Sequence, residues 1–330
     1  MKKNYFKIGI KHSGSFQHVQ KISPVILSIV VTLLVHGCTH SRQLTLQDTG
    51  KIHSAKMFCV MEQKEFHAIT DNSTDAVRAM AFSHGAIGAA IGYLMTSAMK
   101  PLTQNEIRDK LFLPLKASLA DMDINSNFAH QLRAELGNKI DGFNVTDIAT
   151  RQENLKKEEL YKLLWFMPES ALVIFDIQHT FSVNLRMFEF NVEVSVKLQN
   201  HGDLEAPSIY LGEYHFVSAP RPEEQDTFNY WLEDNGKTTR YAIKEAINET
   251  IKMLKLDFLD KLNKPHENKN EFNETVYVDL GTKVFMFIKR LQDNDTRVII
   301  QNKQGALYSV AKESLSKPPQ GVIDAYTEGL

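Results

Sequence analysis

The sequence is poor in several residue types and patterns, and each shortage excludes a class of protein. Its 330 residues include only two cysteines, Cys38 and Cys59, which are too few for a disulfide framework. The formal net charge of -2 gives no sign of nucleic-acid binding. The sequence also lacks a GxSxG elbow, an HExxH pair and a Walker loop. We therefore expect no cofactor, no resident metal and no catalytic activity.

The composition is that of a chain that folds. Hydrophobic residues make up 43% of the sequence and charged residues 24%. This is enough apolar material for a core, and it argues against global disorder. The length suits one large or two modest domains.

Charge is distributed unevenly along the chain. Residues 1–37 contain five lysines and no acidic residue, so that 33 of the 38 basic residues remain against all 40 acidic ones in the rest of the chain. An apolar run follows from Val25 to Val35 and is broken only by Ser28 and Thr32. It is shorter than the roughly 20 residues of a membrane-spanning helix, but it matches the apolar region of a signal peptide.

Val35-His36-Gly37-Cys38 resembles a bacterial lipobox, in which an aliphatic residue, a small residue and Gly or Ala precede a cysteine. His36 departs from that pattern. The resemblance implies cleavage before Cys38, lipidation of its thiol and anchoring to a membrane, because two or more acyl chains hold a protein stably in a bilayer. Thr39, in place of Asp, implies sorting to the outer membrane on its periplasmic face. An uncleaved signal anchor and a secreted protein cut elsewhere are the alternatives.

The remaining segments divide the chain by composition. We expect a signal peptide over 1–37, a polar tether over 38–54, a strand with a glycine-rich segment over 55–104, an α+β domain over 105–262, and a linker with a small β-rich domain over 263–330.

Residues 79–99 form a second apolar stretch with no charged residue other than the weakly basic His84. Gly85, Gly88 and Gly92 lie among alanines, so this segment could be a nucleotide-binding loop, a membrane helix or a helix buried in the fold or in a subunit interface. A nucleotide-binding loop needs the spacing G-x-G-x-x-G directly after a strand, and this segment has a different spacing. The other two use small residues for close packing, which makes these glycines candidates for oligomer or membrane contacts.

The clearest secondary structure lies in the second half of the chain. Strict alternation of apolar and polar residues over 175–185 and 190–198 predicts two antiparallel strands with one wet face. An apolar stripe over 237–262 predicts a long amphipathic helix. Further strands are expected at 56–61, 143–148, 208–218, 276–280, 283–288, 298–301 and 306–310, and further helices at 105–119, 125–136 and 155–167. This order predicts an α+β fold with a mixed, largely antiparallel sheet covered by helices on one face.

PLKASLADMDINSNFAHQLRAEL (114–136) and YWLEDNG (230–236) resemble segments of a family of uncharacterised proteobacterial lipoproteins. The element order is also similar to the periplasmic domains of the curli-secretion lipoprotein CsgG and the penicillin-binding-protein activator LpoB, and to the amino-terminal domain of TolB. The resemblance implies an α+β periplasmic domain, and it brings no catalytic residue with it.

The sequence suggests one candidate metal site. Glu213 and His215 alternate along one predicted strand, and His179 on a neighbouring strand could supply a third ligand. The opposing interpretation places His179 on an apolar face and the other two side chains on the wet side. We favour a non-catalytic envelope protein that binds other envelope proteins or itself. The alternatives are a membrane-active oligomer built on 79–99 and an envelope hydrolase.

Overall fold

The structure is a computed structural model that describes residues 51–321, apart from 64–65, 67, 69–103, 137–138, 141–142, 183–184, 200–207, 223–224, 260–271, 273 and 282. The predicted signal peptide, Cys38, most of the tether, the glycine-rich segment and most of the predicted linker lie outside the described residues. Within the described part of the chain, no helix is long and apolar enough to cross a membrane.

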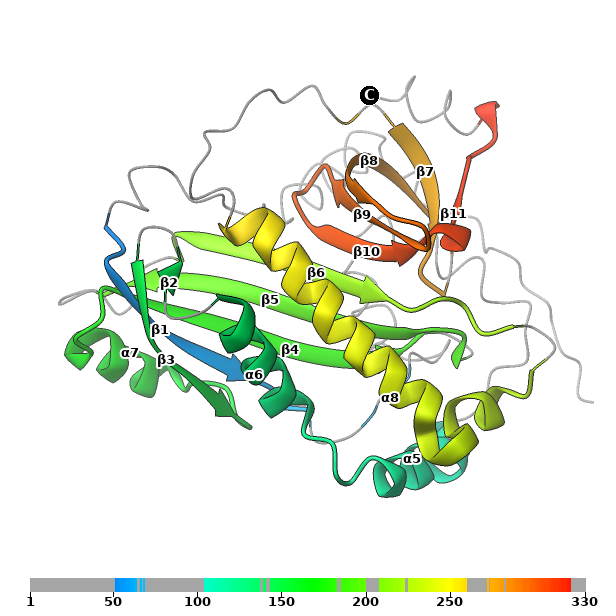
Figure 1. Ribbon diagram of the computed structural model, residues 1–330, viewed down its shortest axis with the longest axis horizontal. Helices are drawn as coiled ribbons and strands as arrows, with labels where there is room; N and C mark the ends of the chain where they lie inside the picture. Colours follow the sequence, from blue (N-terminus) through cyan, green and yellow to red (C-terminus); the bar gives the residue numbers. More distant parts are fainter. Residues whose placement is uncertain are drawn as a thin grey trace, which may run out of the picture. The chain divides into compact units, whose positions relative to one another are not determined.

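Strands of the described residues form one sheet in the order β11-β7-β8-β9-β10-β6-β5-β4-β1-β3-β2 (Figure 1). Their bounds are β1 Ser54–Val60, β2 Lys139–Ile140, β3 Phe143–Arg151, β4 Ala171–Phe181, β5 Phe188–Leu198, β6 Tyr210–Val217, β7 Glu274–Asp279, β8 Lys283–Asp293, β9 Arg297–Asn302, β10 Leu307–Ala311 and β11 Leu315–Ser316.

Strand directions in this sheet are mixed. β1 lies between β3 and β4 and runs parallel to both. β4, β5 and β6 are antiparallel neighbours, and β10 then joins β6 in parallel. The remaining neighbours, from β7 to β10 and at the two edges β11 with β7 and β2 with β3, pair antiparallel. The predicted α+β fold with a mixed sheet is therefore confirmed.

Helices occupy the connections. They are α4 Gln104–Ile107, α5 Leu113–Ser118, α6 Ile124–Leu136, α7 Lys157–Phe166 and α8 Thr227–Leu254, with π-helical turns at Arg108–Phe112 and Lys255–Leu259. The first π turn leads directly into α5, which has Pro114 in its first turn. Proline has no N–H to donate to the carbonyl four residues before it, and the wider π turn accommodates that missing bond.

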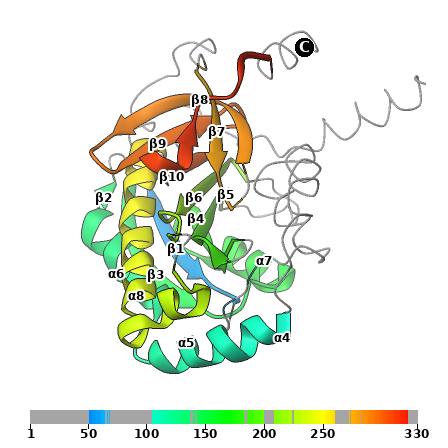
Figure 2. The same cartoon turned by 90° about the vertical axis from the view of Figure 1, so that its right-hand side faces the viewer.

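The main core lies between helices α6 and α8 and the face of the sheet that they cover. Phe128 and Leu132 of α6 and Ile243, Ile247 and Ile251 of α8 are buried there. Apolar residues of β4 and β5 that share one face, as the alternation predicts, pack against them. α7 instead packs on the opposite face, where Leu164 and Met167 meet Phe58, Val60 and Leu172 (Figure 2). Helical cover is thus concentrated on one face, with α7 on the other.

One predicted helix start is shifted and another is confirmed. α6 begins after Asp123, whose carboxylate accepts hydrogen bonds from the Ser126 N–H at 2.9 Å and the Ser126 hydroxyl at 2.7 Å, so Asp123 is the cap rather than Asn125 or Ser126. α8 consists of two helical pieces separated by a kink at 233–236. The first piece, which was not predicted, begins at Thr227, where Asp226 accepts from two backbone N–H groups, and the second begins at the predicted Lys237.

A sharp turn interrupts α8 within the YWLEDNG motif at residues 230–236. Asp234, Asn235 and Gly236 all have positive φ angles, of 50°, 58° and 73°. A Cβ atom on Gly236 would lie 2.8 Å from the Ser118 hydroxyl oxygen. Glycine is therefore required for both its backbone conformation and the close approach of α5.

β7 to β11 surround a second core. Val276, Val278, Ile288, Ile300 and Val310 are buried in it, together with Met187, which precedes β5, and Val217 at the end of β6. This arrangement places the predicted C-terminal β strands around their own apolar cluster, although they continue the hydrogen-bonded sheet through β10.

Candidate functional site

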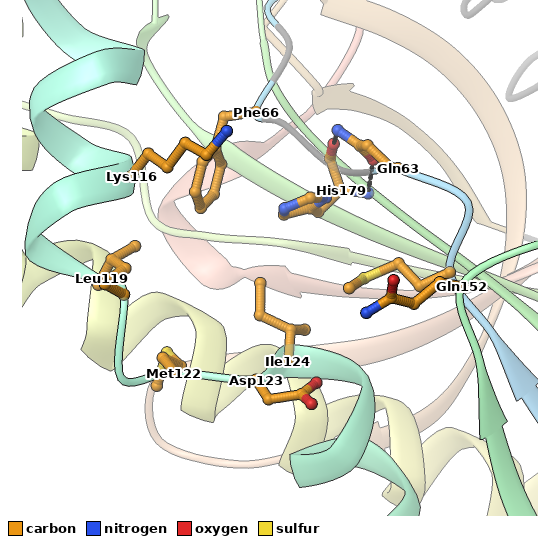
Figure 3. Close-up of a pocket in the computed structure, with 11 residues that line it drawn as sticks. Gln63, Phe66, Lys116, Leu119, Met122, Asp123, Ile124, Gln152 and His179 are labelled. Carbon is orange, nitrogen blue, oxygen red and sulfur yellow. Dashed lines mark hydrogen bonds between the residues drawn. The ribbon is translucent and has the colours of Figure 1, made fainter.

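A pocket of about 360 Å³ lies beyond the carboxyl ends of β1 and β3 (Figure 3). The segment that follows β1, the α5–α6 connection, the residue after β3 and one side chain of β4 enclose it. Its lining residues are Met61, Gln63, Phe66, Lys116, Leu119, Ala120, Met122, Asp123, Ile124, Gln152 and His179. In sheets with parallel strands, the carboxyl ends are where ligands characteristically bind. The parallel trio β3-β1-β4 creates such an edge here.

His179 forms one wall of this pocket, and the backbone around it is held by Gln63. The Gln63 amide nitrogen donates to the His179 carbonyl at 2.7 Å, and its amide oxygen accepts from the His179 N–H at 3.0 Å. One side chain thus continues the ladder along β4 after β1 has ended at Val60. The Phe66 ring lies 4.6 Å from the His179 ring, centroid to centroid.

The rest of the wall is apolar and adaptable. Met61 and Met122 contribute thioethers, and Leu119 and Ile124 contribute aliphatic side chains. Unbranched methionine side chains adjust to ligands of irregular shape. Lys116 on α5 and the capping Asp123 lie on different sides of the pocket, and both are exposed (Figure 3). The pocket therefore presents apolar walls with one positive and one negative group at its rim.

The hypothesis of a metal site on Glu213, His215 and His179 is wrong. Tyr214 and Phe216 lie in the main core together with Phe181, so the alternating His215 and Glu213 face the other side of the sheet from His179. Among the described residues, no three His, Cys, Asp or Glu side chains are placed to hold a metal ion. The parity of these strands separates the two histidines.

Cys59 is not a reactive nucleophile. It is buried in β1, and burial raises the pKa of its thiol to about 12. A thiol with such a pKa is protonated near neutral pH and has little thiolate for attack. The structure therefore places Cys59 in the core as a small hydrophobic residue, as its position in the predicted strand implies.

Tyr210, Tyr214 and Asp257 form a buried polar cluster between β6 and the π-helical turn that follows α8. Both hydroxyl groups donate to Asp257 Oδ2, at 2.8 Å from Tyr210 and 3.1 Å from Tyr214, and they also contact each other. Burial raises the pKa of both tyrosines well above the usual value. The cluster stays protonated at its hydroxyls and fastens the C-terminal end of α8 to the sheet.

Cys38, Gly85, Gly88 and Gly92 lie outside the described residues, so their predicted roles remain predictions. The pocket is not evident from the sequence. Its residues come from three separated segments, and only the parallel pairing of β1 with β3 and β4 brings them together. One feature of the sequence does point to it. Asp121 and Asp123 lie between two helical patterns and mark the turn that closes the pocket.

No family model matches the sequence, and no curated protein matches it. Among solved structures, the chain is similar to the hypothetical protein CT253 from Chlamydia trachomatis. The two share 9% identity over 61% of this chain and 96% of that one, with a TM-score of 0.23. A likeness at that level carries no argument about fold or function.

Proposed function

We propose that this chain is a non-catalytic, lipid-anchored protein of the bacterial envelope that works by binding another envelope protein. The observation that supports it best is the pocket at the carboxyl ends of β1 and β3. Its walls of Met61, Met122 and Leu119 suit an apolar side chain. Interfaces gain most of their binding energy from such an anchor side chain seated in a pocket and surrounded by polar groups.

Two charged residues at the rim of the pocket also support this proposal. Lys116 and Asp123 are both exposed and differ in sign, so they pair with polar or charged groups next to the anchor on the partner. Asp123 is also held by its two bonds from Ser126, which fixes the carboxylate before binding. A preordered rim lowers the entropy lost on association.

A matched pair of tryptophan variants tests the pocket. Ala120 lines it and Ala117, one turn earlier on α5, does not, yet both are exposed. A photo-crosslinking residue at Lys116 is expected to capture an envelope protein in cells. Ala120→Trp fills the pocket and abolishes that crosslink, whereas Ala117→Trp preserves it. Equal capture by both variants, or no captured protein with the unmodified pocket, contradicts the proposal.

The proposed location depends on Cys38. Its lipidation would hold the domain at the periplasmic face of the outer membrane, with the polar residues 39–54 as the tether. Labelled palmitate is expected to enter the wild-type chain and not the Cys38→Ala variant. Labelling that is equal in both, or absent from both, would remove the anchor.

A second candidate function rests on residues 79–99, which contain no Asp, Glu, Lys or Arg. In this alternative, Gly85, Gly88 and Gly92 pack copies of the segment against each other in a membrane-active oligomer. Gly88→Leu should then disrupt assembly measured by crosslinking in membranes. A chain without residues 1–38 that remains monomeric in detergent and leaves liposomes unbound would exclude this function.

A further inference from the structure

Three carboxylates stand side by side on the sheet face opposite to the one that α6 and α8 cover. Asp176 of β4 is directly opposite Glu193 of β5, and Glu193 is directly opposite Glu213 of β6. We call these three residues the acidic row. Side chains directly opposite each other on neighbouring antiparallel strands lie about 5 Å apart at Cβ, and like charges in that position destabilise a sheet.

The acidic row is electrostatically unfavourable in the folded chain. Burial, followed by the nearby carboxylates of Glu213 and Asp176, raises the pKa of Glu193. Burial and the carboxylate of Glu62 raise the pKa of Asp176 in the same way. None of the ion pairs identified among the described residues joins a lysine or arginine to any member of the row. The fold therefore holds a concentration of negative charge that a cation would relieve.

His215 lies at one end of this row and provides an independent sign of a ligand. The residue is only 8% exposed, and its ring stacks on Tyr308 with centroids 4.6 Å apart and an angle of 17° between the planes. Its Nδ1 lies 2.8 Å from Asn191 Oδ1. An amide oxygen only accepts, so Nδ1 carries the proton in this hydrogen bond, and in the neutral imidazole Nε2 then has a lone pair.

The lone pair of His215 is directed at the row. Nε2 is buried without a hydrogen-bond partner, and it lies 3.8 Å from Glu213 Oε2. That distance is too long for a direct hydrogen bond. Two acceptors separated in this way need a donor between them, because an unsatisfied buried acceptor costs about 1–3 kcal/mol.

We propose that Glu193, Glu213 and His215 form a binding site for a primary ammonium group. Such a group has three N–H donors, and the site offers two carboxylates and one imidazole lone pair as acceptors. An ammonium is also a compact point charge, which suits acceptors on three sides better than a planar guanidinium does. A lysine side chain of a partner protein and a free polyamine share this chemistry. The site is independent of the pocket, which lies on the other face of the sheet.

Titration calorimetry of the full chain in detergent tests this site with two probes. Spermidine represents the free polyamine, and a short lysine-containing peptide represents the protein side chain, with the same peptide acetylated on its lysine as the negative control. Binding of either probe, with loss of peptide binding on acetylation, is the expected result, and the tighter probe identifies the source. If calcium chloride displaces both probes when it is present at the same concentration as the probe, the row attracts any cation, and the proposal is overturned.

Three variants separate a built site from a general acidic surface. Glu213→Gln should weaken binding at least tenfold, whereas Glu313→Gln removes the same charge from an exposed position outside the row and should leave it unchanged. His215→Phe retains an aromatic ring to stack on Tyr308 and both carboxylates, but removes the acceptor, so it should also weaken binding. Equal effects of Glu213→Gln and Glu313→Gln, or normal binding by His215→Phe, would overturn the site.

Folding of the variants is checked independently. Because Glu213→Gln relieves repulsion in the row, it should raise the thermal midpoint of the free protein while lowering affinity, a combination that a purely structural role does not give. In the wild-type protein, the ¹⁵N resonance of His215 Nε2 should shift on addition of spermidine. A resonance that stays in place at saturating spermidine contradicts the proposal even if every variant fails to fold.

Discussion

The Ser309 hydroxyl on β10 donates a hydrogen bond of 2.8 Å to Glu249 Oε2 on α8, and both residues are buried. Arg297 of β9 extends the same network. Its guanidinium donates to Ser309 Oγ at 3.1 Å, to the Ser309 carbonyl at 2.7 Å and to the Val217 carbonyl at 2.7 Å. Helix α8 and the C-terminal strands are therefore joined by a polar network as well as by apolar packing.

Replacement of Arg297 tests the energy of that network. Arg297→Met leaves the Ser309 hydroxyl oxygen and two backbone carbonyls without their donor, and it removes the ion pair with Glu245, so we expect a loss of about 3–5 kcal/mol in the free energy of unfolding. Arg290→Met is the matched control, because Arg290 makes two bonds of 2.7 Å to Glu274 but both side chains are more than one-third exposed. Arg290→Met should lower the free energy of unfolding by only about 0–1 kcal/mol. Urea denaturation measures both, and equal losses would contradict the role of burial.

Local periodicity predicted the elements that depend only on their own residues. β4 follows the predicted alternation from Phe175 to Phe181 and β5 follows it over 190–198, while the buried residues of α8 and of the π-helical turn after it follow the stripe from Ile243 to Phe258. The pairing of β1 with both β3 and β4 could not be predicted, because nothing in a single strand records its distant neighbours. Since the pocket lies at the end of that parallel trio, it was also beyond the reach of the sequence.

The cap of α6 shows a second kind of limit. Asp123, Asn125 and Ser126 are all residues that cap helices well, so composition could not select among them. In the fold, Asn125 donates to the carbonyls of Cys59 at 3.1 Å and Arg151 at 2.9 Å, which fastens α6 to the ends of β1 and β3. This tertiary use of Asn125 leaves the cap to Asp123.

Gly212 on β6 permits the tyrosine cluster to form. A Cβ atom at this position would lie 2.4 Å from the Tyr210 hydroxyl oxygen, because the Tyr210 ring crosses over the glycine to reach Asp257. Gly212→Ala should therefore displace the ring and cost about 1–3 kcal/mol in thermal or urea unfolding. In the Tyr210→Phe background the same change should cost less, because the closest clashing atom is gone and the ring is no longer held by a hydrogen bond to Asp257 when it moves aside. A cost that is equal in both backgrounds would contradict this steric explanation.

Glu189 makes stability depend on pH. Its Oε1 is buried without a hydrogen-bond partner, and burial raises the pKa of this carboxyl group to about 8 from 4.5. Between those two values the folded state retains a proton that the unfolded state has lost, so the free energy of unfolding falls as pH rises from about 4.5 to 8. The loss should be on the order of 2–4 kcal/mol. Urea denaturation at several pH values should show a flatter profile for Glu189→Gln, and an unchanged profile would contradict the assignment.

A count of reactive thiols tests the fold and the proposed anchor together. In the lipidated protein the Cys38 sulfur is a thioether, and the buried Cys59 has a pKa raised to about 12. Protein extracted from membranes should therefore show no thiol toward a disulfide reagent while folded, and one after denaturation. If Cys38 carries no lipid, two thiols appear on denaturation. A thiol that reacts rapidly in the folded Cys38→Ala variant would instead contradict the burial of Cys59, because no other cysteine remains in that chain.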